Sequence, residues 1–199
     1  MADDPTIKLI EALIRCESIT PNDAGCQKLI RKRLEVAGFA CENFDYEDVS
    51  NLWAKIGTTG PTLCFAGHTD VVPPGDLTLW NSDPFEPVIT SRHMYGRGAA
   101  DMKSGLAAMI VAAEQFLIDA QQFSGNIAFL ITSDEEGDAI NGTRKVVETL
   151  LSRGETIEWC VIGEPSSHQQ LGDTIRIGRR GSLSGRLIIR GTQGHVAYP

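Results

Sequence analysis

Apolar residues recur at helical spacing along the first part of the chain. The first predicted helix follows Pro5, and one of its faces carries Ile7, Ile10, Leu13 and Ile14. The segment from Ser18 to Asn22 contains Pro21 and ends this helix. A second helix is predicted from about Asn22, with Gly38 well placed to end it.

Short, continuously apolar runs follow, and these predict strands that are buried on both faces. They cover residues 62–67, 126–132 and 158–163, and a further strand is predicted at 52–56. A helix rich in Ala, Met and Leu is predicted at 102–120, and another runs to about residue 151 with Asn141 as its cap. The alternation of strands and helices predicts an α/β fold with a mostly parallel central sheet flanked by helices.

The pattern changes after Gly178. Residues 182–190 alternate between apolar and polar positions, which is typical of a half-exposed antiparallel strand. We therefore predict one domain over residues 1–178 and the beginning of a second over 179–199. The second stretch is too short to bury a face of its own, so we expect a fragment, or a protein whose remainder is absent.

Composition narrows the class of protein. The chain has 199 residues, of which 42% are hydrophobic, and a formal net charge of −8. This excludes a wholly disordered chain and argues against binding to nucleic acid or to an anionic membrane. No apolar run has the length of a spanning helix, and no secretory signal is visible. Five cysteines without C-x-x-C spacing predict buried free thiols in a reducing cytoplasm.

Ionisable side chains follow each of the three predicted buried strands. These residues are His68 and Asp70, then Glu135 and Glu136, then Glu164. Asp101 lies at the junction between a glycine-rich loop and the helix of residues 102–120. Because ligands bind beyond the carboxyl ends of the strands in open α/β sheets, we expect these side chains to meet at one edge.

Carboxylates that converge in a cleft repel one another, and a bound dication removes this cost. A neutral imidazole with carboxylate oxygens suits zinc (Zn²⁺), with cobalt (Co²⁺) or manganese (Mn²⁺) as substitutes. Asp101 could bridge two ions, and a carboxylate left free of metal could act as general base. Asp70 could accept the imidazole N–H of His68 and orient the ring.

Each of these residues also has an ordinary structural interpretation. An acid after a strand is more often a solvated loop residue or a helix cap, and His68 could be a structural histidine. Only the recurrence of acids at successive strand ends favours a metal site. The sequence supports a nucleotide-binding module less well. Gly96-x-Gly98 lacks the third glycine of a dinucleotide loop, and no P-loop motif is present.

Four motifs in a fixed order nevertheless resemble one known family. They are residues 67–73 (GHTDVVP), 95–103 (YGRGAADMK), 132–137 (TSDEEG) and 163–165 (GEP). The family is that of the dinuclear-zinc amidohydrolases, which include aminoacylases, carboxypeptidase-like enzymes and acetylornithine deacetylases. The resemblance implies a zinc-exopeptidase-like catalytic domain, the truncated start of an α+β dimerisation (lid) domain, two zinc ions per subunit and a homodimer.

The resemblance also implies roles for single residues. The metal ligands would be His68, Asp101, Glu136 and Glu164, with Asp101 as the bridge, His68 and Glu164 on one ion and Glu136 on the other. Glu135 would be the general base and Asp70 the partner of His68; spacing alone does not distinguish Glu135 from Glu136. His195 would reach the partner subunit's active site and help to hold the oxyanion, and Arg179 and Ser182 would contact substrate.

Residues 80–85, 163–167 and 178–185 resemble the branch that hydrolyses the amide of N-succinyl-L,L-2,6-diaminopimelate. The products are succinate and L,L-2,6-diaminopimelate, for lysine and peptidoglycan synthesis. A related deacylase acting on acetylornithine, or a metal-binding fragment without catalysis, is the alternative. Family members are longer and carry a further metal-ligand histidine, so we expect the 199-residue chain to be inactive or nearly so.

Overall fold

The computed structural model describes residues 3–120, 122–178, 185, 187–195 and 197. The chain divides into two compact units, Met1–Pro165 and Ser166–Pro199. The domain boundary expected between residues 178 and 179 falls inside the second unit and stays a prediction. Of the strand predicted at 182–190, residues 182–184 and 186 lie outside the described part, and residues 185 and 187–190 are not in a strand.

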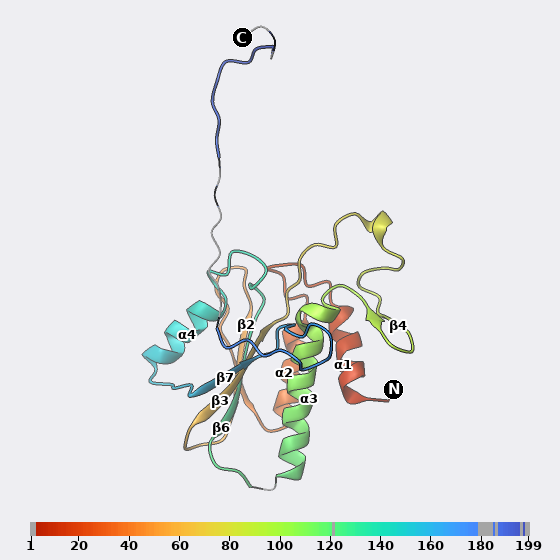
Figure 1. The fold of residues 1–199 in the computed structure, drawn as a ribbon. Helices are drawn as coiled ribbons and strands as arrows, with labels where there is room; N and C mark the ends of the chain where they lie inside the picture. Colours follow the sequence, from red (N-terminus) through yellow and green to blue (C-terminus); the bar gives the residue numbers. More distant parts are fainter. Residues whose placement is uncertain (1–2, 121, 179–184, 186, 196, 198–199) are drawn as a thin grey trace. The chain divides into compact units, whose positions relative to one another are not determined.

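A five-stranded sheet forms the centre of the first unit, with the strand order β1-β2-β6-β3-β7 (Figure 1). The strands are β1 (Ala40–Asn43), β2 (Asn51–Ile56), β3 (Thr62–His68), β6 (Asn126–Thr132) and β7 (Trp159–Ile162). β3 runs parallel to both β6 and β7, whereas β2 is antiparallel to both β1 and β6. The predicted α/β sheet is thus confirmed as a mixed sheet, whose parallel part is β6-β3-β7.

Connection length explains this mixture. Only residues 44–50 join β1 to β2, which is too short for a parallel crossover. Between β3 and β6 lies a long connection that includes α3 (Ser104–Asp119), and this length permits a parallel pair. The strand runs were readable from the sequence, but the direction of β2 was not.

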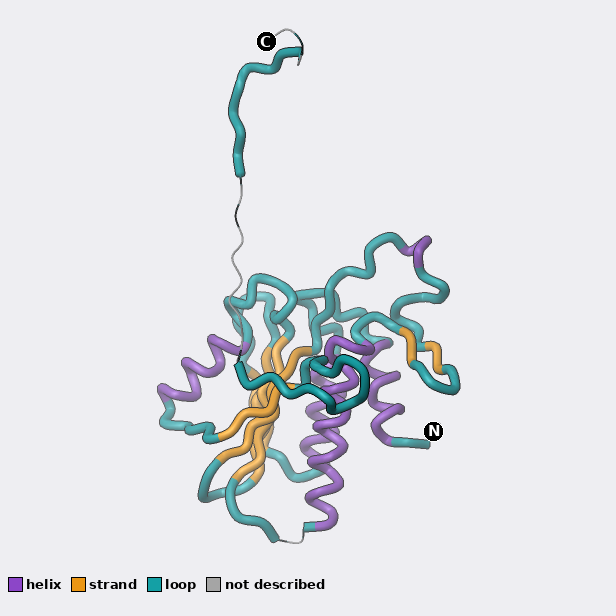
Figure 2. Tube along the Cα trace, viewed as in Figure 1, coloured by secondary structure: helices purple, strands orange, loops and turns teal. Residues whose placement is uncertain are grey.

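Helices cover both faces of the sheet (Figure 2). α1 (Pro5–Ile14), α2 (Cys26–Val36) and α3 pack with Ile127, Phe129 and Ile131 of β6 in one core. α4 (Thr143–Ser152) packs with Ala128 and Leu130 of the same strand in a second core. β6 is therefore buried along its whole length, as its continuous apolar run predicted.

Two sequence predictions need correction. Asn141 does not cap α4: the residue at the N-cap is Gly142, and the Asn141 side chain donates to Glu47 instead. β7 is exposed along its length, because it lies at the edge of this sheet and has a neighbour on one side only. All five cysteines are free as predicted, but only Cys26 and Cys64 are buried: Cys16 and Cys41 are half-buried, and Cys160 of β7 is exposed.

The loop between β3 and α3 contains the remaining elements. These are η1 (Leu77–Leu79), the two-stranded sheet of β4 (Val88–Ile89) and β5 (Met94–Tyr95), and the π-helical turn η2 (Ala99–Lys103). η2 leads directly into α3, so the helix predicted at 102–120 is confirmed with a distorted start. Within the described part of the chain, we find no helix with the length and apolar character needed to cross a membrane.

Candidate metal centre

Four segments of the first unit bring acidic side chains around one histidine. His68 is the last residue of β3, Glu135 and Glu136 follow β6, and Glu164 follows β7. Because these strands are parallel and adjacent, their carboxyl ends share one edge of the sheet. Asp101 reaches the same place from η2.

The ligand atoms of these residues lie close together. His68 Nε2 is 3.1 Å from Asp101 Oδ1, 3.4 Å from Glu164 Oε1 and 3.9 Å from Glu135 Oε2. Two groups have all their ligand atoms within 4.8 Å of one another: His68 with Glu135 and Glu164, and His68 with Asp101 and Glu136. His68 belongs to both groups, so an imidazole and four carboxylates form one cluster.

The orientation of the His68 ring follows from its other nitrogen. Nδ1 lies 2.8 Å from the backbone oxygen of Asp70, and a carbonyl oxygen only accepts hydrogen bonds. Nδ1 therefore carries a hydrogen and donates it to Asp70. In the neutral imidazole this leaves the lone pair on Nε2, which faces the carboxylates and is available to a metal ion.

Asp70 connects two segments of the cluster, the end of β3 and the loop that follows β6. Its fully buried carboxylate lies 3.4 Å from His68 Nδ1 and accepts hydrogen bonds from the backbone N–H groups of Glu135 and Glu136, at 3.1 and 3.0 Å. Burial by itself raises the pKa of Asp70, but these hydrogen bonds and the charge of His68 outweigh it, and the net pKa is lowered. Asp70 thus holds the imidazole and the Glu135–Glu136 backbone in fixed positions.

The electrostatics of the cluster suit a divalent cation. Burial by itself lowers the pKa of His68. Hydrogen bonds and charge from Asp70 and Glu164 outweigh this effect and raise the pKa to about 11. The pKa values of Asp101, Glu135 and Glu136 are raised, first by burial and then by neighbouring carboxylates. The negative charge exceeds what one imidazolium can neutralise, and a donor set of nitrogen and carboxylate oxygen is one that divalent metals accept.

Glu164 is positioned by a close helix–strand approach. Gly105 of α3 lies so near the residue before Glu164 that a Cβ atom at Gly105 would overlap with the carbonyl oxygen of Gly163. This contact requires glycine at position 105, and the sequence analysis did not anticipate it. Its signal was a glycine inside a predicted helix, which usually has a packing reason.

Gly105→Ala is therefore expected to displace Gly163 and Glu164. Overpacking of this kind costs about 1–3 kcal/mol of stability, and we expect metal affinity to fall about tenfold because one ligand moves. Calorimetric zinc titration and thermal unfolding measure the two effects. Gly191→Ala is the control, because a Cβ there meets no atom within 4 Å. Unchanged zinc affinity in Gly105→Ala would contradict the expectation.

Of the three other predicted site residues, only His195 is among the described residues. His195 belongs to the second unit, where its Nδ1 accepts a hydrogen bond of 3.2 Å from the Ala197 backbone. Arg179 and Ser182 fall outside the described residues. His93 and His168, for which no role was expected, are in neither ligand group.

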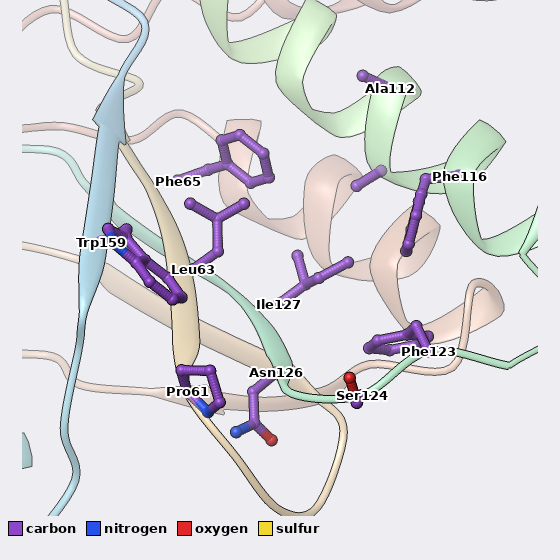
Figure 3. A pocket seen from close by; sticks show the side chains of 11 residues that line it. Pro61, Leu63, Phe65, Ala112, Phe116, Phe123, Ser124, Asn126, Ile127 and Trp159 are labelled. Atoms are coloured by element: carbon purple, nitrogen blue, oxygen red, sulfur yellow. The ribbon is translucent and has the colours of Figure 1, made fainter.

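An apolar pocket of about 370 Å³ lies away from this cluster, between the sheet and α3 (Figure 3). Its walls include Leu63 of β3, Phe116 of α3 and Trp159 of β7, which point toward one another. None of the residues that line it has a titratable side chain. The side chains that line this pocket therefore offer no acid–base or metal-ligating group.

Comparison with curated proteins finds close relatives. The chain is 57% identical over 194 residues to succinyl-diaminopimelate desuccinylase of Alkalilimnicola ehrlichii, and 59% identical over 194 residues to the protein of the same name in Thioalkalivibrio sulfidiphilus. Both alignments cover 98% of this chain and 52% of the relative. The chain thus spans about half the length of these relatives.

Solved structures share the fold. Human carnosine dipeptidase 1 superimposes with a TM-score of 0.67 at 25% identity, over 79% of this chain and 37% of that one. The M20 family metallo-carboxypeptidase Sso-CP2 from Sulfolobus solfataricus gives a TM-score of 0.72 at 19% identity, over 82% of this chain and 38% of that one. The family model of peptidase family M20/M25/M40 matches residues 64–196, which include all the strand-end acids. Since this match covers more than half of the chain, the protein belongs to peptidase family M20/M25/M40.

Proposed function

We propose that this chain carries the metal-binding part of a dinuclear zinc amidohydrolase that acts on N-succinyl-L,L-2,6-diaminopimelate. The observation that carries the proposal is the cluster in which one imidazole, His68, belongs to two ligand groups at the ends of parallel strands. The choice of substrate is supported by the names of the two relatives that are 57% and 59% identical.

The family resemblance supports a division of the carboxylates and the imidazole between two ions. His68 and Glu164 would hold one ion, Glu136 the other, and Asp101 both; Co²⁺ or Mn²⁺ could replace Zn²⁺. Bound metal would supply Lewis-acid polarisation of the amide carbonyl and would acidify a water molecule. Asp70 keeps the His68 ring oriented by accepting from Nδ1, so that Nε2 stays directed at the cluster.

Glu135 is the proposed general base. It lies next to Glu136 in the chain, and burial raises its pKa, which brings the carboxylate closer to the pH at which proton transfer works best. It would take a proton from the attacking water and give it to the leaving amine. The water oxygen bonds to the succinyl carbonyl carbon, the C–N bond breaks, and succinate and the free amine leave.

Residues outside the first unit complete the proposal. His195 would help to hold the oxyanion of the tetrahedral intermediate in the partner subunit of a homodimer. Arg179 and Ser182 would contact the substrate, for which the guanidinium of Arg179 offers bidentate binding of a carboxylate. We place the enzyme in the cytoplasm, acting on a small molecule and on neither nucleic acid nor membrane.

The test uses a protein of the relatives' full length that carries this sequence. It is loaded with zinc or cobalt and given N-succinyl-L,L-2,6-diaminopimelate or N-acetylornithine, and amine release is measured. We expect kcat/KM to favour the succinyl substrate by about 100-fold or more, because the site would hydrogen-bond a carboxylate that the acetyl group lacks. Preference for N-acetylornithine would favour the related deacylase, and turnover of neither would overturn the proposal.

The 199-residue chain is measured in parallel. We expect it to bind metal with little or no turnover, which is the behaviour of a metal-binding module. Turnover of the succinyl substrate by this chain, lost in Glu135→Ala, would show instead that residues 1–199 suffice for catalysis.

A further inference from the structure

One lysine of the first unit is fully buried beside the candidate metal centre. Lys103 has no exposed surface, and it is among the largest fully buried side chains of the described residues. A buried ammonium is costly unless its hydrogen bonds are satisfied. The proposed hydrolysis assigns this residue no role, so its burial needs another explanation.

The ammonium binds the end of a helix. Lys103 Nζ donates to the backbone oxygen of Leu13 at 2.8 Å and to that of Cys16 at 3.0 Å. α1 ends at Ile14, so these carbonyls lie at its C-terminal end, where the helix dipole favours a cation. The side chain therefore ties η2 to α1.

The stem of Lys103 is confined on its way to α1. A Cβ atom at Gly98 would come within 3.1 Å of Lys103 Cδ and 2.6 Å of Val71 Cγ1. Gly98 is the N-cap residue directly before η2, and its carbonyl accepts the Lys103 backbone N–H at 2.9 Å. Glycine at position 98 thus leaves the room in which the lysine chain lies.

The same short segment carries Asp101. Asp101 and Met102 have non-helical backbone angles, so regular helical geometry does not fix their positions. Instead, Asp101 Oδ1 lies 3.1 Å from His68 Nε2, and Met102 Sδ accepts the His68 backbone N–H at 3.3 Å. Lys103 supplies the third attachment, to the end of α1.

We propose that Lys103 is a positioning residue which, by anchoring η2 to the C-terminal end of α1, sets the place of Asp101 relative to His68 and thereby the metal affinity of the centre. The inference rests on the proposed function, because it takes Asp101 as a metal ligand. It involves no proton transfer by Lys103 and no contact with substrate.

The test is cobalt binding by the 199-residue chain. Lys103→Met and Lys103→Gln remove the cation and keep much of the side-chain length. We expect the Kd for Co²⁺ to rise about 10- to 100-fold, as for other residues that support metal ligands. We also expect the visible absorption of bound Co²⁺ to change, because the position of Asp101 changes. Circular dichroism establishes that each variant is folded.

Arg33→Leu is the matched control. It breaks the ion pair between Arg33 and Glu114, which joins α2 to α3 and lies nine residues beyond Gly105 along α3. Arg33→Leu is expected to lower thermal stability. Its Kd for Co²⁺ should stay within threefold of the parent, and its cobalt spectrum should be unchanged. A loss of stability alone therefore does not imitate the effect proposed for Lys103.

Each outcome decides the inference. A folded Lys103→Met or Lys103→Gln with a Kd within threefold of the parent and the parental spectrum would overturn it. If neither neutral variant folds, Gly98→Ala is used, because a Cβ there would come within 3.1 Å of Lys103 Cδ and displace the lysine stem. An unchanged cobalt spectrum in folded Gly98→Ala would overturn the inference as well. Failure of the parent chain to bind Co²⁺ or Zn²⁺ would instead remove the proposed metal centre itself.

Discussion

Replacing His68 by alanine is expected to remove from the first unit the zinc ion that His68 and Glu164 would hold. His68 is common to both ligand groups found among the described residues, and it supplies their only nitrogen. Without it, each group keeps two carboxylates, and the pKa values of Asp101, Glu135 and Glu136 are raised by burial and by neighbouring carboxylates. We expect zinc affinity to fall by more than a factor of about 1,000, or about 4 kcal/mol.

The measurement is zinc per chain by elemental analysis after equilibration and dialysis. The parent is expected to retain one or two zinc ions per chain, and His68→Ala one fewer. His93→Ala is the control, because His93 is exposed and belongs to neither ligand group. His68 is buried, so circular dichroism of the variant is recorded too. A folded His68→Ala chain that keeps the parental zinc content would show that the cluster is not the metal site.

The second prediction with a large expected effect distinguishes the proposed roles of two neighbouring glutamates. In a protein of the relatives' length, Glu135→Gln is expected to lower kcat about 10²- to 10⁴-fold, because glutamine cannot take the proton from water. Zinc content should stay at the parental value, since Glu135 is proposed not to be a ligand. Glu136→Gln should do the reverse and lose zinc from one of the two positions.

This pair is a demanding test because the geometry alone permits either assignment. Glu135 lies in one ligand group and Glu136 in the other, and both backbone N–H groups are held by Asp70. The same substitution at adjacent positions controls for the change in charge. Zinc loss in Glu135→Gln together with retained zinc in Glu136→Gln would exchange the two proposed roles.

Hydrophobic pattern was sufficient for most of the local structure. The apolar runs of β3 and β6 and the helical faces of α1 and α3 are where the sequence predicted them. Pattern works here because these elements are buried on both faces or along one clear stripe, so burial dictates residue type at every position. It also predicted the cluster of the candidate metal centre, because ionisable residues follow the strands that the sequence predicted.

The hydrophobic pattern was insufficient where the exposure or direction of an element depends on residues far away in the sequence. An edge strand and a central strand can have the same apolar run, so the exposure of β7 was not readable from residues 158–163. Strand direction likewise depends on which partner a strand meets, and β2 meets β6 across 70 residues of chain. Gly142 in place of Asn141 at the start of α4 is a shift of one residue, which pattern does not resolve.

The sequence by itself determined the α/β class, the extent of the central strands and the set of residues that gather at their ends. Only the tertiary structure decided which hydrogen bonds hold those residues. Asp70 accepts from the His68 ring and from the Glu135 backbone, and Lys103 donates to the end of α1. The physical reason is the separation along the chain over which each interaction acts. Burial and backbone preference act on each residue locally, whereas a hydrogen bond between side chain and backbone needs two segments brought together by the fold, and 90 residues separate Lys103 from Leu13.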